Sequence, residues 1–472
     1  MTSPLRRSAA ESPSRSSIQP NYGASSSRHD EETARGRSKP SGLQRELSAR
    51  QVQMIAIAGT IGTGLFLGTG KSLAQGGPAS MLICYSIIGF IVYVTLLLLG
   101  EMATQYPVAG SFNAYTTRFF SPAYGFALGW NYWFNDAVSV ASDLTAAQLV
   151  IQFWATSNAW VVSVVFWVFL VGVNAIHVRA YGELEYWLSS LKVITVILFI
   201  IVGTLVNMGF NTESRVIGFE NWRIPGAPFV GGFGGFAHVF VTASYAFGGT
   251  ESLGITAGET RNPTKNMPRV VKLVFWRILT FYLLTILLIG LNGESCVEWA
   301  QVLNIVGVSN QIAWLSIGLS SWRFRKAWLK QGRAPEQLKF RASWTWPWGP
   351  PFVVVGVTVL IIVQGWSSFV PKFSPVDFIS FYIEVPIMLL MTVAYLIRSR
   401  SFSPSLGVAG EQESEPLLSR PCERAVQRDG FADLVDVSTV DLYADEHTEE
   451  EEDESTEDKA SGVLQRIYYW LV

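Results

Sequence analysis

The stretch that most constrains this chain is Gly59–Gly70, which reads GTIGTGLFLGTG and overlaps the apolar run Met54–Leu67. Each glycine lowers helix stability by about 1 kcal/mol relative to alanine. In lipid, an unpaired backbone group costs more still, so irregular backbone persists there only where it lines a cavity or is buried in protein. Gly59, Gly62 and Gly64 therefore predict a membrane helix broken near its middle, with free N–H and C=O groups that face a ligand.

Two other interpretations apply to the same glycines. Gly64 and Gly68 have the small-xxx-small spacing of a helix-packing face. The letters GTGKS also resemble the end of a phosphate-binding loop. That motif requires a glycine where Leu65 stands, so we reject a nucleotide site.

Composition supports a polytopic membrane protein. The 472 residues are 49% hydrophobic and only 15% charged, whereas about 25% charged residues are usual in a soluble protein. At about 20 apolar residues per crossing, we predict ten spans in an all-α fold. They lie near 53–69, 79–100, 124–154, 159–178, 188–208, 236–257, 271–291, 297–321, 351–370 and 378–397.

Charge in the loops predicts the orientation. With the N-terminus inside, the inner loops 258–270 and 322–350 are rich in Lys and Arg, and the outer loops carry few. This asymmetry follows the positive-inside rule and makes both termini cytoplasmic. We predict three regions: a disordered tail at 1–50, a transmembrane domain at 51–400 and an acidic disordered tail at 401–472.

The C-terminal tail carries candidate interaction signals. The acidic block Glu446–Asp458 is typical of a solvated segment. Glu413 with Leu417 and Leu418 fits an acidic dileucine sorting signal, and the aromatic Val463–Val472 can rest on a membrane surface. Sorting or ubiquitin machinery would be the partners of these tails. The three cysteines have no metal-ligand spacing, and we predict no metal, cofactor or nucleic acid.

A second break is predicted in the sixth span, where Phe247–Glu251 reads FGGTE. Paired glycine-interrupted helices in corresponding places of two halves are the best sequence pointer to a transporter's binding site. The N-terminal ends of half-helices suit a carboxylate, and carbonyl groups freed at a break suit an ammonium group. A zwitterion therefore matches this site.

Ionisable residues within spans are functional candidates. Glu251 lies beside the second break, and Asp136 and Asp143 are seven residues apart on one face of the third span. Lys192 opens the fifth span and has either a role in proton coupling or a place at the headgroups. We interpret His238 as a packing or interfacial residue.

The sequence resembles the fungal amino-acid permeases of the amino acid–polyamine–organocation (APC) transporter superfamily. Five stretches carry this resemblance: IGTGLFLGTGKSLAQGGPAS (61–80), GEMATQYPVAGSFNAYTTRF (100–119), GWNYWFNDAVSVASDLTAA (129–147), FVTASYAFGGTESLGITAGETRNPTKNMP (240–268) with VFWRI (274–278), and SWRFRKAWLKQGRAPEQLKFRA (321–342).

The resemblance implies two inverted helical repeats, a substrate held between broken helices 1 and 6, and proton-driven amino-acid import by alternating access. It implies that the substrate carboxylate meets the backbone near Ile61–Gly64 and the amine meets carbonyls near Phe247–Gly249. It matches Glu251 to a family glutamate and Lys192 to a lysine at the ion position. The expected substrate-binding residues are Ile61, Gly62, Thr63, Gly64, Phe247, Gly248, Gly249, Thr250, Glu251 and Asp143, and the expected proton-coupling residues are Lys192 and Glu251.

The chain departs from the family in one large respect. Span seven runs through Asn292–Cys296 directly into the family's tenth helix at Val297, so helices eight and nine are missing. Their loss should leave the substrate cavity open on one side and expose polar faces to lipid. Asp143 also stands where the family usually has glutamate, and Asp136 where tryptophan is frequent.

These observations leave two hypotheses. The first is a proton-coupled amino-acid importer of the plasma membrane, with the vacuolar membrane as the alternative. The second is a truncated, non-transporting receptor or regulatory protein that keeps the ligand site. An enzyme is the weakest interpretation, because no His, Asp or Glu cluster has ligand or triad spacing, and we predict no enzymatic activity. The carboxylates Asp136, Asp143 and Glu251 favour a cationic or polyamine-like substrate.

Overall fold

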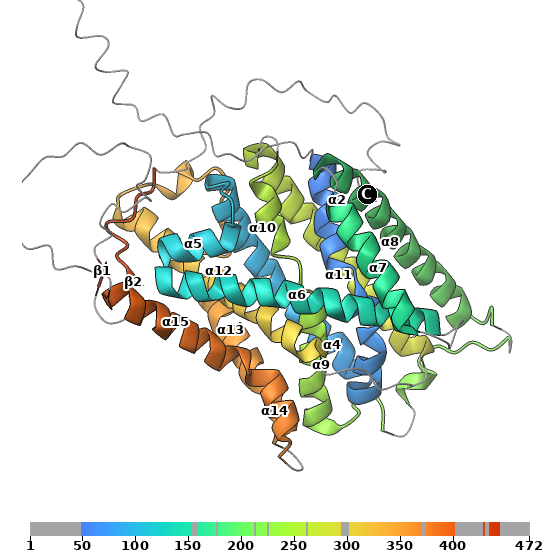
Figure 1. Ribbon diagram of the computed structural model, residues 1–472. Coiled ribbons are helices and arrows are strands. Elements are labelled where there is room, and N and C mark those ends of the chain that lie inside the picture. Colours follow the sequence, from blue (N-terminus) through green and yellow to red (C-terminus); the bar gives the residue numbers. More distant parts are fainter. Residues whose placement is uncertain are drawn as a thin grey trace, which may run out of the picture. The chain divides into compact units, whose positions relative to one another are not determined.

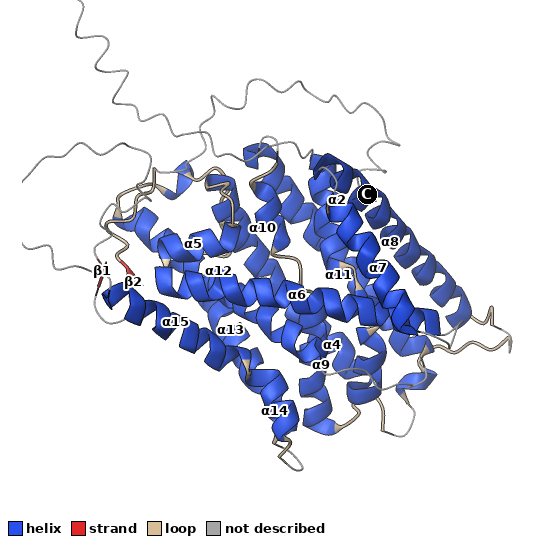
Figure 2. Cartoon of the chain, in the orientation of Figure 1, coloured by secondary structure: helices blue, strands red, loops and turns tan. Residues whose placement is uncertain are grey.

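The computed structural model describes residues 49–152, 159–175, 178–211, 214–223, 226–260, 263–293, 302–369, 373–401, 428–429 and 434–443. These ranges are almost entirely helical (Figure 2). The tail features Glu413, Leu417–Leu418, Glu446–Asp458 and Val463–Val472 lie outside the described residues, as do the N-terminal tail up to residue 48 and the junction at 294–301.

The helices follow one another without intervening sheets (Figure 1). Their bounds are α2 (Ala49–Thr60), α3 (Thr63–Phe66), α4 (Gly68–Gln105), α5 (Ser111–Phe119), α6 (Pro122–Gln152), α7 (Ala159–Asn174), α8 (Val178–Asn207), α9 (Gly232–Ala246), α10 (Ser252–Ala257), α11 (Pro263–Asn292), α12 (Val302–Lys330), α13 (Gly349–Gln364), α14 (Pro375–Tyr382) and α15 (Glu384–Ser401). Short 3-10 turns are η1 (Glu220–Trp222), η2 (Pro335–Gln337) and η3 (Gly365–Ser368). The antiparallel strands β1 (Arg428–Asp429) and β2 (Leu434–Val435) lie in the C-terminal region.

Each of the ten predicted spans overlaps between one and three helices in the described ranges. The boundary between the first two spans differs from the prediction, because α4 contains the end of the first and the whole of the second. The two parts meet at a kink where Gly77 takes a φ of +78° and Pro78 follows. A side chain at Gly77 would come within 2.5 Å of the Pro228 carbonyl oxygen, so both backbone angle and space require glycine there.

The outer helices present large apolar side chains outward, as lipid-facing helices do. On α7, Trp160, Val165 and Trp167 are each more than half exposed. Among the described residues, α4 and the Leu184–Asn207 part of α8 are each long and apolar enough to cross a membrane alone, and α14 and α15, bent by 49° at their junction, reach that length and apolarity only together. The interrupted spans are too short in each piece to pass the same test.

The core lies where α4 packs against α9 and α11, and α9 against α12. Tyr85, Tyr282 and Trp314 are among its largest fully buried side chains. At one end of the bundle, a buried ion pair joins α4 to α12: the Arg325 guanidinium donates to Glu101 Oε2 at 2.6 Å. Helix α9 of the second interrupted span is part of this core, and α2 of the first packs against α8 and α11.

Candidate functional site

The first span is interrupted as predicted. Helix α2 ends at Thr60, Ile61 and Gly62 are non-helical, and α3 begins at Thr63. Gly62 is extended, with φ −150° and ψ −155°. In the described part of the chain, no carbonyl oxygen accepts the N–H groups of Gly62, Thr63 or Gly64. A Cβ added at Gly62 would meet no atom within 4 Å, so open space lies beside Gly62.

The second interruption lies between α9, which ends at Ala246, and α10, which begins at Ser252. Gly249 has a φ of +85°, an angle that side-chain-bearing residues rarely adopt. Two of the freed carbonyl groups have internal donors: Thr250 Oγ1 donates to Phe247 O at 3.1 Å, and Ser252 Oγ donates to Gly249 O at 2.6 Å. A carbonyl oxygen has two lone pairs, so Phe247 O can still accept a second donor.

The two interruptions pack directly against each other. A Cβ added at Gly64 would lie 2.5 Å from Ala246 Cα, and one at Gly249 would lie 2.4 Å from Gly59 O. Gly68 is similarly close to Thr242. Gly64 and Gly68 therefore do form the predicted helix-packing face. The first span has both features, a packing face at these two glycines and a break before Thr63. Gly62 differs from Gly64 and Gly68 because it borders open space.

Polar side chains gather beside the first interruption. The Thr63 hydroxyl donates to Asp143 Oδ1 at 2.9 Å and lies 2.7 Å from the Tyr245 hydroxyl. Because the single Thr63 proton is given to Asp143, Tyr245 must donate to Thr63. The Lys192 ammonium of α8 also interacts electrostatically with the Asp143 carboxylate. Helices α3, α6, α8 and α9 thus contribute to one polar cluster next to the free N–H groups.

Glu251 occupies a different environment. Its side chain is only 1% exposed, and its carboxylate accepts hydrogen bonds from the Tyr132 hydroxyl at 3.1 Å and from the Trp314 indole N–H at 3.2 Å. It also accepts from Gly249 N–H at 3.2 Å. Glu251 therefore ties α6 and α12 to the second interruption.

Several residues of this arrangement had no sequence signal. Tyr245, Tyr132, Trp314 and Tyr282 are aromatic residues in apolar helices, where packing is the ordinary expectation. His238, predicted to pack, lies with its ring 5.8 Å from that of Phe381. Asp136 is exposed on α6 and takes no part in the Thr63 cluster.

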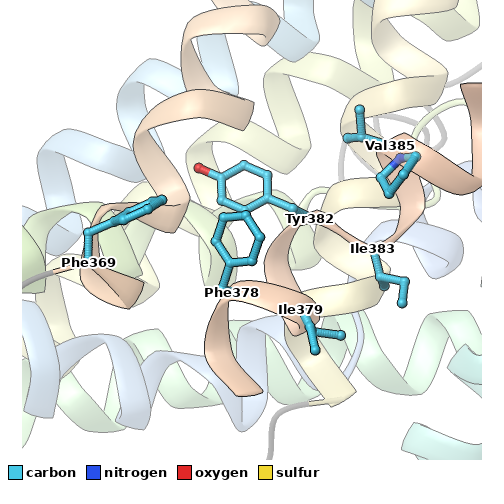
Figure 3. A pocket seen from close by; sticks show the side chains of 7 residues that line it. Phe369, Phe378, Ile379, Tyr382, Ile383 and Val385 are labelled. Carbon is cyan, nitrogen blue, oxygen red and sulfur yellow. The ribbon is translucent and has the colours of Figure 1, made fainter. Parts of the chain in front are cut away.

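An apolar pocket of about 410 Å³ lies elsewhere, at the bend between α14 and α15 (Figure 3). Phe378, Tyr382 and Ile383 are among its lining residues. None of the ten predicted substrate-binding residues lines it, and its lining offers no charged group. The interrupted helices, and not this pocket, carry the polar chemistry expected of a site for a small charged solute.

Comparison with known proteins identifies the family of this chain. The family described as "Amino acid permease" matches residues 51–295 and 295–406. A probable amino-acid permease of Schizosaccharomyces pombe is 34% identical, with 76% of this chain and 93% of the relative covered. The chain belongs to the amino acid permease family. It is accordingly an integral, multi-pass membrane protein of a transporter family, as the sequence predicted.

Other relatives are similar over a shorter region. The lysine-specific permease LysP of Escherichia coli is 49% identical over 53% of this chain and 51% of the relative. The cationic amino acid transporter 1 of S. pombe is 47% identical over 53% of this chain and 42% of the relative. The chain matches about half the length of these two relatives or less.

Proposed function

We propose that this permease imports amino acids by proton symport, with the substrate held between the two interrupted spans. The observation that carries this proposal is the set of unpaired N–H groups at Gly62–Gly64, beside the Thr63–Asp143 pair and the open space at Gly62. N–H groups at the start of a half-helix bind a carboxylate. Phe247 and Gly248 offer carbonyl oxygens for the substrate amine.

We further propose a cationic substrate. Asp143 is a carboxylate at the edge of the site, and it would attract the side-chain ammonium or guanidinium of lysine or arginine. Relatives named for lysine and for cationic amino acids are 49% and 47% identical. A histidine permease and a general amino-acid permease are each 46% identical, so identity alone does not favour the cationic class. The charge at Asp143 does.

Proton coupling would involve Lys192 and Glu251. Lys192 is partly buried on α8 and interacts with Asp143, so a change in the charge of either group would alter the charge beside the substrate. Glu251 links α6, α12 and the second interruption through its hydrogen bonds. Protonation of Glu251 would weaken those bonds and loosen the contact between the three elements.

We also propose that this chain lacks family helices eight and nine, and two observations support this. The family match divides at residue 295. The alignment to the S. pombe permease spans 473 positions although only 76% of this 472-residue chain is covered, so a long stretch of the relative has no counterpart here. Sequencing the transcript across Asn292–Val297 tests the proposal, because an inserted coding segment would contradict it.

The exposed face of α6 fits the same proposal. Trp133, Asp136, Val140 and Asp143 recur at helical spacing along α6, and all four are exposed. An exposed helix face with two carboxylates is unfavourable within a membrane, whereas a covering helix pair would shield it.

We also propose cytoplasmic termini and a plasma-membrane location, with tail signals read by sorting or ubiquitin machinery.

Uptake by the purified protein tests the proposed function. We expect proteoliposomes to accumulate labelled lysine under an inward proton gradient and to lose that accumulation when a protonophore is added. Thr63→Val removes the hydroxyl that donates to Asp143 and changes the side-chain volume very little. It should raise the KM for lysine. Uptake by the wild-type protein no faster than leak into empty liposomes would contradict the proposal.

A further inference from the structure

Part of the C-terminal region is packed against one end of the bundle. Residues Leu434–Tyr443, here called the docked segment, lie within the tail for which the sequence predicted disorder. Val435 N–H donates to Phe120 O at 2.9 Å, just beyond α5. The Tyr106 hydroxyl, at the end of α4, donates to Leu442 O at 2.8 Å. The docked segment therefore makes backbone hydrogen bonds to two elements at once.

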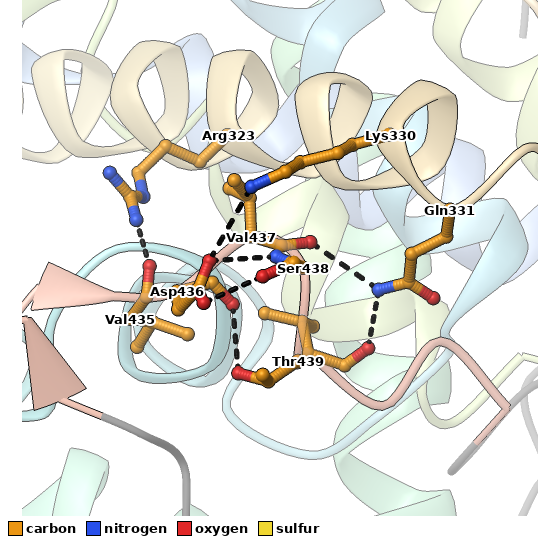
Figure 4. Close-up of polar contacts among 9 residues, drawn as sticks. Arg323, Lys330, Gln331, Val435, Asp436, Val437, Ser438 and Thr439 are labelled. Atoms are coloured by element: carbon orange, nitrogen blue, oxygen red, sulfur yellow. Dashed lines mark hydrogen bonds and ion pairs between the residues drawn. The ribbon is translucent and has the colours of Figure 1, made fainter.

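A third element, α12, holds the other side of the docked segment (Figure 4). The Gln331 amide donates to the carbonyl oxygens of Val440 at 2.7 Å and Val437 at 3.4 Å. Lys330 Nζ lies 3.9 Å from Asp436 Oδ1, and the Arg323 guanidinium donates to Val435 O. Figure 4 shows these side chains of α12 directed at the docked segment.

Burial shows that the apolar side chains of the docked segment contribute to the contact. Val435, Val440 and Leu442 are 2%, 5% and 0% exposed, although Ser438 and Thr439 between them are exposed. The Arg333 guanidinium also lies 4.1 Å from the centre of the Tyr443 ring. This alternation of inward apolar and outward polar residues is typical of a segment that fits a specific surface.

The charges of the two sides are complementary. The docked segment carries Asp436 and Asp441. The surface that receives it carries four basic side chains, namely Arg118, Arg323, Lys330 and Arg333. Below this surface, the buried Glu101–Arg325 ion pair already joins α4 to α12. The docked segment thus spans the same helices that the ion pair connects.

We propose that the ends of α4, α5 and α12 form a docking surface for an acidic, apolar peptide, and that the chain's own docked segment occupies it as a latch that restrains opening at this end of the bundle. Separating α5 or the end of α4 from α12 requires the segment to leave at least one of them. Its effect on transport rests on the proposed function; its restraint of the helices does not.

Leu442→Asp tests the latch because it places a charge at a fully buried position. Thr439→Asp is the matched control, with the same charge at an exposed position of the same segment. Hydrogen exchange of the purified full-length proteins provides the main measurement. We expect Leu442→Asp to speed exchange of the docked segment, of α5 and of the end of α4 by roughly tenfold or more, and Thr439→Asp to leave all three unchanged. Val440→Asp repeats the test if Leu442→Asp does not fold.

The outcomes separate the latch from the proposed function. Faster exchange in the docked segment alone, with α5 and the end of α4 unchanged, would overturn the latch. Unchanged exchange in the docked segment of both buried-site variants would overturn the docking itself. If all three regions exchange faster, the latch is supported even where no protein shows uptake, and the lack of uptake then counts against the transport proposal alone. Where the wild-type protein transports lysine, the latch also requires Leu442→Asp to transport it faster than Thr439→Asp.

Discussion

The Tyr282 hydroxyl lies 2.6 Å from the carbonyl oxygen of Thr60, the last residue of α2. The same hydroxyl lies 2.5 Å from the carbonyl oxygen of Ala246, the last residue of α9. The last carbonyl groups of a helix lack intrahelical donors. One buried side chain of α11 therefore contacts the last carbonyl oxygens of α2 and α9 at once, and so fixes the positions of the two helix ends relative to each other.

Replacing Tyr282 with Phe should destabilise the protein by about 1–3 kcal/mol, because it leaves buried carbonyl oxygens without a donor. We also expect a higher KM for substrate, since the two interruptions would no longer be held at a fixed separation. Thermal unfolding of the detergent-solubilised protein and concentration-dependent uptake measure the two effects.

Tyr382→Phe is the matched control for this prediction. The Tyr382 hydroxyl also donates to a backbone carbonyl oxygen, that of Ile362 at 2.8 Å. Tyr382 lies in α14, away from the interruptions. We expect Tyr382→Phe to leave KM unchanged. An equal KM for the Tyr282 and Tyr382 variants would show that Tyr282 does not position the site.

Gly249→Ala should prevent normal assembly of the two spans. Its φ of +85° is strained for alanine by roughly 1–2 kcal/mol, and the new Cβ would lie 2.4 Å from Gly59 O. We expect a sharp loss of monodisperse protein in size-exclusion chromatography. Gly70→Ala should be tolerated, because a Cβ at Gly70 meets no atom within 4 Å; equal yields of the two variants would contradict this account.

The two interruptions were predictable because glycines are costly in a helix, so their clustering at Gly59–Gly64 and Gly248–Gly249 required a local reason. The partners of those interruptions were not predictable. Tyr282 reaches Thr60 across 222 residues of sequence, and an isolated aromatic residue in an apolar helix gives no sign of which backbone group it contacts. The docked segment was missed because the tail as a whole is acidic, and Val435, Val440 and Leu442 are too unevenly spaced to indicate a helix or a strand.

Asp143→Asn should lower the preference for cationic substrates. The substitution keeps an oxygen that can accept from Thr63 but removes the charge that would attract a second ammonium group. We expect the ratio of kcat/KM for lysine to that for a neutral amino acid to fall on the order of tenfold. Competition uptake with both substrates measures the ratio in each protein, and an unchanged ratio would remove Asp143 from substrate selection.

Arg325→Met should destabilise the bundle by about 3–5 kcal/mol, because it leaves the Glu101 carboxylate buried without its cation. Glu101 and Arg325 are 2% and 3% exposed. The double variant Glu101→Gln/Arg325→Met should recover much of this loss. Arg341→Met, which breaks an exposed pair with Glu336 at 3.0 Å, should cost about 0–1 kcal/mol. Equal thermal shifts for the two single variants would contradict the importance of burial.

Docking of Leu434–Tyr443 should be insensitive to pH across the physiological range and should weaken only in strong acid. Hydrogen bonds from the Ser438 hydroxyl and backbone N–H lower the pKa of Asp436, and Lys330 and Arg323 lower it further. A carboxyl whose pKa is lower when docked contributes its stabilisation fully above its ordinary value, and that contribution is lost as the pH falls through the docked value.

Other charged groups at this contact include Arg118, Arg333 and Asp441, and β1, which pairs with Leu434 and Val435, consists of Arg428 and Asp429. The docked segment contains no histidine. Nothing in the docked segment is therefore expected to titrate between pH 5 and pH 8. A nitroxide on Thr439→Cys, with Cys296 and Cys422 replaced by serine, should stay equally immobilised over that range and gain mobility below about pH 4. Asp436→Asn should show the greater mobility already at pH 7. A rise in wild-type mobility between pH 7 and pH 5 would contradict the assignment, because Asp436 remains ionised throughout that interval.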